Sequence, residues 1–229
     1  MNIKFTERAI APTSVVHHDD GTATMIVGLP IGYREHRLVG VLNHEIGTHY
    51  LRKYNERKQI WFRNRQKFNL KDYLMIEEGL ASINQTFEEA IAPTGTPYLY
   101  QAALHYYAAY LASQMSFEEL YAYLRTYISD PIKLWRECVR VKRGYHDTST
   151  KGGMYKDQVY LRGCIEILKN RHKIDFAALM CGKFNLKDYF KLKASEQITR
   201  QDTKLPYFMN DMKQYVKALD RIALANSID

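Results

Sequence analysis

Residues 44–49, His44-Glu45-Ile46-Gly47-Thr48-His49, place two histidines five positions apart, and this spacing decides how the sequence is interpreted. They fall within a predicted helix over about 34–55, because apolar residues recur there at three- and four-residue intervals. In a regular α-helix, positions five apart differ by about 140° around the axis, so the imidazoles would diverge. A π-type bulge takes up about one extra residue per turn and realigns them. Gly47 makes such an irregularity easier, and we therefore predict a bulged helix with both histidines on one face.

The same six residues have the composition of a metal site. They resemble the His-Glu-x-x-His helix of zinc peptidases, with one additional residue between the histidines. In that chemistry two imidazoles hold Zn²⁺, and the glutamate accepts a proton from the attacking water. The pattern predicts His44 and His49 as ligands of one zinc ion and Glu45 as the catalytic base.

A third ligand is expected on the next predicted helix, residues 71–90, which carries Glu77-Glu78-Gly79-Leu80-Ala81. In the gluzincin superfamily, which this arrangement resembles, a glutamate on the following helix completes the site, often just before a glycine. Glu78 matches that position. Glu77 lies about 100° further around the helix, so it would point elsewhere and support the site rather than bind the metal.

Together these segments resemble the microtubule-associated tyrosine carboxypeptidase family, which includes bacterial proteins with a Gln-Glu-Gly-Leu-Ala motif. The bacterial motif keeps only the second glutamate, which favours Glu78 over Glu77 as the ligand. The likeness extends over most of the chain and includes residues 11–18, 33–52, 115–121, 138–149 and 156–161. The family's characterised activity is removal of the C-terminal tyrosine from α-tubulin, whose tail is strongly acidic.

The resemblance implies a single metallopeptidase domain over residues 1–229, with a gluzincin-like α+β fold that is mostly α. Its parts would be a β-rich edge (1–33), the zinc-site helices (34–90) and a helical half (91–229). Family members generally extend well upstream of the motif helix, so we expect a shortened homologue or a fragment. The strand prediction comes from residues 22–29, which follow an Asp20-Gly21 turn and would pair with residues 14–17.

A second candidate site is the polar loop 144–153 with its flanks, which are rich in cations and glycine. A carboxypeptidase must hold the substrate's terminal carboxylate, for which arginine is well suited, and must stabilise an oxyanion. Arg143, Lys156 and Tyr160 match the family's Lys-Arg-Gly and Lys-Asp-Gln-Val-Tyr segments, so the resemblance implies them as substrate-binding residues. His146 could also donate to the oxyanion, although an exposed basic loop with a surface histidine is the simpler interpretation.

Charge indicates the kind of partner. The 229 residues carry a net charge of +8, with eight basic residues and one acid over 52–71 and eleven basic residues and four acids over 133–173. The remainder is net negative, so the positive charge is local and suits an acidic C-terminal peptide tail, that of tubulin by the family resemblance. Two solvated helix faces would give the same pattern. No RNA- or DNA-reading signature accompanies the charge, so no specific nucleic acid is expected.

Composition excludes several classes of protein. A hydrophobic content of 46% with 25% charged residues is typical of a globular chain rather than a disordered one. No run of about 18 apolar residues occurs, so no membrane partner is expected. Three cysteines without metal-ligand spacing predict free thiols in a reducing compartment, hence a cytoplasmic protein. Association with the cytoskeleton is implied by the family resemblance.

Two other functions remain open at this stage. One is a zinc peptidase that acts on a different acidic protein or peptide. The other is a non-catalytic basic module that binds microtubules or polyanions. The oligomeric state is open as well.

The helix starts are predicted from capping residues. The heptapeptide Lys-Phe-Asn-Leu-Lys-Asp-Tyr occurs at 67–73 and again at 183–189, and in both copies the asparagine is predicted to cap a helix. Further helices are expected to begin near Pro97, Ser116, Asp130, Asp157, Asp175 and Pro206.

Overall fold

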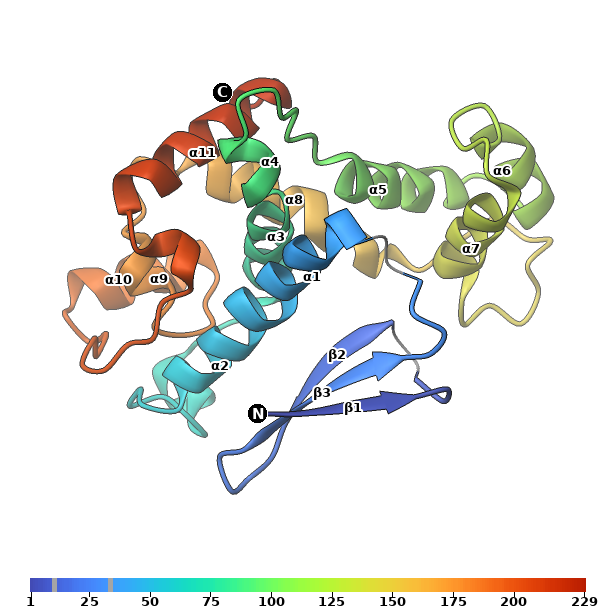
Figure 1. The fold of residues 1–229 in the computed structure, drawn as a ribbon. Coiled ribbons are helices and arrows are strands. Elements are labelled where there is room, and N and C mark those ends of the chain that lie inside the picture. The colour runs from blue at the N-terminus through green and yellow to red at the C-terminus, as the bar shows by residue number, and fades with distance from the viewer. Residues whose placement is uncertain (10–11, 33–34) are drawn as a thin grey trace.

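Three short strands at the N-terminus form a small sheet beside a largely helical body (Figure 1). The computed structural model describes residues 1–9, 12–32 and 35–229. Strand β3 (Ala23–Gly28) lies between β1 (Asn2–Thr6), which runs parallel to it, and β2 (Thr13–His17), which runs antiparallel. The predicted strand and its pairing with residues 14–17 are confirmed. Strand β1 was not predicted because its side chains are almost all exposed and show no alternation of burial.

The motif helix is continuous but changes its hydrogen bonding along its length. A 3₁₀ turn (Glu35–Arg37) leads into α1 (Leu38–His44), a π-helical turn (Glu45–Tyr50) and α2 (Leu51–Glu56). The predicted bulge is therefore confirmed at the residues between the two histidines. The predicted helix start at residue 34 lies outside the described residues.

The next helix differs from its prediction. Residues 71–90 form two helices, α3 (Leu74–Gln85) and α4 (Phe87–Ile91), instead of one. Asn69 caps neither, because it has a φ of +54° and ends a 3₁₀ turn (Arg65–Phe68). The helix instead begins at Leu74, whose backbone N–H donates a hydrogen bond to the Asp72 carboxylate. The predicted cap at Asn69 is thus wrong.

The remaining helices mostly begin where their caps predict. They are α5 (Tyr100–Ala112), α6 (Phe117–Leu124), α7 (Pro131–Lys142), α8 (Gln158–Lys169), α9 (Phe176–Leu179), α10 (Leu186–Ala194) and α11 (Met212–Ala225). Ser116, Asp130, Asp175 and Asn185 each accept backbone N–H groups as predicted N-caps. Two starts are misplaced: α5 begins three residues after Pro97, and α11 is capped by Asp211, since Pro206 only precedes a 3₁₀ turn (Tyr207–Met209).

Two hydrophobic cores lie within the part of the chain that the structure describes. The larger one is formed mainly by α3, α8 and α11, with residues such as Leu80, Ile167 and Leu219 fully buried. The smaller one lies between the second half of α5 and helices α6 and α7, and α5 connects these two helices, at one end of the molecule, to the rest (Figure 1). The α+β, mostly α class is confirmed. No helix in the described part of the chain is long and apolar enough to cross a membrane.

Candidate metal centre

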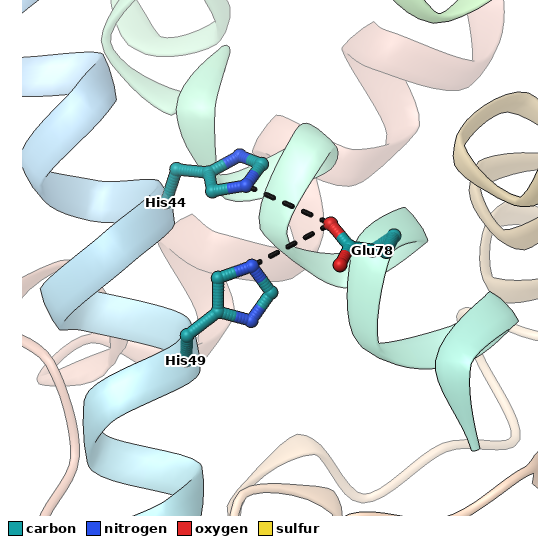
Figure 2. Close-up of side chains that lie close together, drawn as sticks. All are labelled: His44, His49 and Glu78. Carbon is teal, nitrogen blue, oxygen red and sulfur yellow. Dashed lines mark ion pairs between the residues drawn. The ribbon is translucent and has the colours of Figure 1, made fainter. Parts of the chain in front are cut away.

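His44, His49 and Glu78 converge on one point between the motif helix and α3 (Figure 2). Their ligand atoms all lie within 4.8 Å of one another. The Nε2 atom of His49 is 3.5 Å from Glu78 Oε2, and the Nε2 atom of His44 is 3.8 Å from that same oxygen. The three predicted ligands are therefore brought together, each with one donor atom directed at the common point.

A buried polar chain fixes the π-helical turn that aligns the histidines. The Thr48 hydroxyl donates to the Asn43 carbonyl oxygen at 2.9 Å and accepts from the Asn84 side chain at 2.8 Å. Tyr215 of α11 donates in turn to the Asn84 amide oxygen at 2.7 Å. Gly47 is required for close packing, because a Cβ there would lie 2.9 Å from the Phe208 ring. The bulge is thus anchored from both α3 and α11.

Two glycines set the position of Glu78. A Cβ on Gly79 would lie 2.3 Å from the backbone of Gly163, and a Cβ on Gly163 would lie 1.9 Å from the Met75 carbonyl oxygen. Helices α3 and α8 therefore cross with their backbones in contact. This crossing holds Glu78, beside Gly79, near Tyr160, which precedes Gly163 by about one turn of α8.

Glu77 orients His49 rather than binding at the common point. Its Oε1 atom accepts from His49 Nδ1 at 2.8 Å, which leaves Nε2 directed at Glu78. Arg52 and Lys183 hold the same carboxylate, at 2.6 Å and 2.7 Å. Burial would raise the pKa of Glu77, yet these two cations and the His49 bond hold its pKa far below the usual range. Such a carboxylate on the far nitrogen of a ligating histidine fixes its tautomer and orientation.

The remaining titratable groups at the centre are strongly perturbed. Burial, together with the adjacent His49, lowers the pKa of His44 to about 4. Burial alone would lower the pKa of His49, but its hydrogen bonds to Glu77 and Glu78 outweigh burial and raise that pKa to about 9. Burial also raises the pKa of Glu45 to about 7. These directions describe groups that are held close together in a poorly solvated site.

The donor set fits a divalent metal ion. Two imidazole nitrogens and one carboxylate oxygen are one of the three-ligand sets that occur in catalytic zinc sites. Tetrahedral zinc with bonds of about 2.1 Å separates its ligand atoms by roughly 3.4 Å, close to the two distances found here. The three residues also line an open cavity of about 380 Å³, together with Glu45, Tyr160 and residues of β2. A fourth ligand and a substrate can therefore reach the common point.

The structure separates the predicted substrate-binding residues. Tyr160 lines the cavity of the metal centre, and burial raises its pKa to about 12. Arg143 is bound to Asp157 at 2.9 Å, Lys156 and His146 are exposed on the surface, and these three lie outside the described lining of that cavity. Their roles stay predictions.

The basic stretch 52–71 is only partly a charged surface. Arg52 is fully buried, and Arg65 pairs with Glu56 at 2.7 Å. The other cations of the stretch lie at or near the surface, and several line a cavity of about 920 Å³ that also contains Asp19 and Asp20. His17 lines both this cavity and the one at the metal centre, so the two adjoin.

Sequence reasoning missed two residues that support the site, Arg52 and Lys183. Arg52 could have been found, because it follows His49 by three residues and shares its helix face. No pattern in the sequence could have identified Lys183, because it reaches Glu77 from a segment more than a hundred residues away.

Comparison with known proteins places these residues in a family context. The family model described as microtubule-associated tyrosine carboxypeptidase matches residues 21–227. The chain is 41% identical over 212 residues to a Mus musculus protein named "Putative tyrosine carboxypeptidase MATCAP2", covering 91% of this chain and 39% of that protein. It is 38% identical over 219 residues to microtubule-associated tyrosine carboxypeptidase 1 of Rattus norvegicus, covering 94% of this chain and 45% of that protein. The chain thus spans less than half the length of these relatives.

Proposed function

The chain belongs to the microtubule-associated tyrosine carboxypeptidase family, and from this premise we propose that it is a zinc metallocarboxypeptidase. It would remove a C-terminal tyrosine from an acidic protein tail, that of α-tubulin in the first instance. The observation that carries the proposal is the convergence of His44, His49 and Glu78 beside Glu45 in an open cavity. Association with the cytoskeleton follows from the same proposal.

The proposed mechanism assigns one role to each side chain. His44, His49 and Glu78 would hold the ion, and Glu77 would keep His49 Nε2 directed at it. A zinc ion, when bound, supplies Lewis-acid polarisation of the scissile carbonyl and makes water acidic enough to ionise near neutral pH. Glu45 would accept the proton of the attacking water and deliver it to the leaving amine. Tyr160, which lines the same cavity, would donate a hydrogen bond to the developing oxyanion.

The charge distribution supports an acidic substrate. Lys53, Arg57, Arg63 and Lys67 line the large cavity that adjoins the metal centre at His17. Carboxylates upstream of the scissile bond would be attracted to these cations, and the attraction should weaken as salt is added. In this proposal the acidic part of the tail lies toward the large cavity, and the terminal residue lies on the opposite side of the metal. Arg143 and Lys156 remain predicted contributors to attraction of the terminal carboxylate.

The proposal is tested with a peptide ending in Glu-Glu-Tyr and with the same peptide amidated at its C-terminus. Mass spectrometry should show release of tyrosine from the first peptide and none from the second. A chelator should abolish release, and added zinc should restore it. Cleavage of the amidated peptide would indicate a different peptidase, and binding of the peptide without cleavage or zinc would indicate a non-catalytic basic module.

A further inference from the structure

The two histidines of the metal centre differ in how their second ring nitrogen is held. Nδ1 of His49 is fixed at 2.8 Å by the Glu77 carboxylate. Nδ1 of His44 is buried and has no hydrogen-bond partner of ordinary geometry among the described residues. A neutral imidazole that binds a metal through Nε2 carries its proton on Nδ1. With its Nε2 directed at Glu78, His44 therefore has a buried N–H group that requires an acceptor.

The side chain of Gln85, the last residue of α3, is a candidate for that acceptor. It lines the same small cavity as His44. Burial lowers the pKa of His44, and the Gln85 amide, as a hydrogen-bond partner of the ring, opposes that effect. The amide is therefore close to the ring, although the two groups are not aligned for an ordinary hydrogen bond. A buried donor and an amide that can accept from it thus lie side by side.

Gly40 gives Gln85 the room to lie against the motif helix. It precedes His44 by four residues, about one turn of α1, so the two residues share a helix face. A Cβ at Gly40 would lie 2.6 Å from the Gln85 carbonyl oxygen and 3.2 Å from Gln85 Cγ. The end of α3 and the stem of the Gln85 side chain are therefore packed directly on α1, one turn before His44. A rotation of the amide at the end of this stem can align it with Nδ1 without movement of either helix.

We propose that Gln85 is the positioning residue of His44. Its amide oxygen accepts the Nδ1–H group and keeps Nε2 directed at the metal, as Glu77 does for His49. Both ligating histidines are then oriented from α3, the helix that also carries Glu78. The inference rests on the proposed zinc site and adds to it a residue that lies outside the sequence motifs.

The two positioning residues differ in charge. The Glu77 carboxylate is offset by Arg52 and Lys183, whereas the Gln85 amide is neutral and needs no such partners. A carboxylate on the far nitrogen makes a ligating histidine more basic, and an amide does so less. Replacement of Gln85 by glutamate should therefore strengthen the hydrogen bond to His44, and replacement by leucine should remove it.

The direct test is NMR spectroscopy of the zinc-loaded protein with ¹⁵N-labelled histidine. Each ligating histidine should give an Nδ1–H proton signal, and the signal of His49 is identified by its shift in Glu77→Gln. The His44 signal should move upfield and exchange faster with water in Gln85→Leu, and should move downfield in Gln85→Glu. If Gln85→Leu does not fold, the downfield shift in Gln85→Glu decides, because that side chain has nearly the same shape.

Zinc affinity, measured by competitive chelator titration, is the second readout. It should fall by about 10- to 100-fold in Gln85→Leu, the usual effect of losing such a partner, and should be at least that of the wild type in Gln85→Glu. Gly40→Ala, which displaces the end of α3, should lower the affinity in the same direction as Gln85→Leu.

A matched control is Gln101→Leu, the same substitution at another glutamine of that cavity. The amide of Gln101 lies 3.1 Å from His105 Nε2, so the His44 signal and the zinc affinity should both stay as in the wild type. A zinc-loaded protein whose His44 signal is the same with glutamine, leucine and glutamate at position 85 contradicts the role of Gln85 and leaves the proposed function intact. A wild-type protein that binds no zinc contradicts the proposed function and the role of Gln85 with it.

Discussion

The metal centre and the junction between α7 and α8, residues 140–157, are both rich in charge but use it differently. At the centre, three donor atoms face one another across an open cavity, and a fourth group, Glu77, orients one of them. At the junction, the buried carboxylate of Asp157 binds both Arg140 and Arg143. Lys142 is also buried there and donates to three carbonyl oxygens, those of Thr150 and Gly152 in the neighbouring loop and that of Met115 between α5 and α6.

The difference shows that charge density alone does not mark a reactive site. The buried charges at the junction bind one another or backbone carbonyl oxygens. At the centre, in contrast, the side chains of His44, His49 and Glu78 are held in place but directed at a common point. Arg140 belongs to both regions, because it also lines a second cavity, of about 210 Å³, that shares His44 and Tyr160 with the cavity of the metal centre. Four variants can break or sharpen this comparison.

The largest effect is expected from His49→Ala. Loss of one of three ligands should remove the zinc ion and bring tyrosine release to background, as measured by metal analysis and peptide mass spectrometry. Arg143→Ala at the junction should keep the ion and change kcat/KM only through substrate binding. Equal zinc content in His49→Ala and wild type would contradict the assignment of His49 as a ligand, and with it the distinction between the metal centre and the junction.

Gly163→Ala should come next, because it forces α8 away from α3. A Cβ at Gly163 would lie 1.9 Å from a backbone oxygen, so the helices must separate and Glu78 and Tyr160 must shift with them. We expect a loss of about 1–3 kcal/mol in the free energy of unfolding, measured by denaturant titration, together with slower turnover. Gly32→Ala is the control, since nothing lies within 4 Å of its Cβ position.

Glu77→Gln should have an intermediate effect, on zinc affinity. Without the carboxylate, His49 is less firmly oriented and its ligand nitrogen is less basic, so the affinity should fall by about 10- to 100-fold. Asp157→Asn removes an equally buried carboxylate at the junction and should leave zinc affinity unchanged while lowering stability. A competitive chelator titration measures the zinc affinity of both variants. If both affinities fell equally, the loss in Glu77→Gln could not be attributed to the orientation of His49 by Glu77.

The smallest effect is expected from Lys67→Ala, which removes an exposed cation from the wall of the large cavity. KM for an acidic peptide should rise by roughly two- to threefold at low salt and approach the wild-type value at high salt, because exposed charges are screened. Lys213→Ala, an exposed cation on α11, is the control. If the rise in KM did not depend on salt, Lys67 would contribute through direct contact with the peptide and not through long-range electrostatic attraction.

Much of the metal site could be predicted from the sequence because its geometry is local. Residues 44–49 belong to one helix, so their spacing alone required a bulge, and the structure has a π-helical turn there. Glu78 was predicted from the resemblance, because in the related motifs a glutamate just before a glycine on the next helix completes the site. The second cavity, which Arg140 lines together with His44 and Tyr160, could not be predicted, because it depends on how α3, α5, α7 and α8 are arranged in space.

The repeated heptapeptide shows where local reasoning ends. Residues 67–73 and 183–189 are identical, yet Asn185 caps a helix and Asn69 adopts a left-handed conformation. The two copies contact each other, since Asp188 accepts from the Lys71 N–H at 2.7 Å. Their phenylalanines, Phe68 and Phe184, both pack against Trp61. Tertiary contacts therefore decide between two structures that the same seven residues can adopt.

The most direct test of the account is the zinc content and turnover of Glu45→Gln. Glu45 is not a proposed ligand, so the variant should bind one zinc ion per chain as the wild type does. Its release of tyrosine from a Glu-Glu-Tyr peptide should be slower by about 10²- to 10⁴-fold, the contribution of a general base. Wild-type turnover in the zinc-loaded variant would contradict the proposed mechanism.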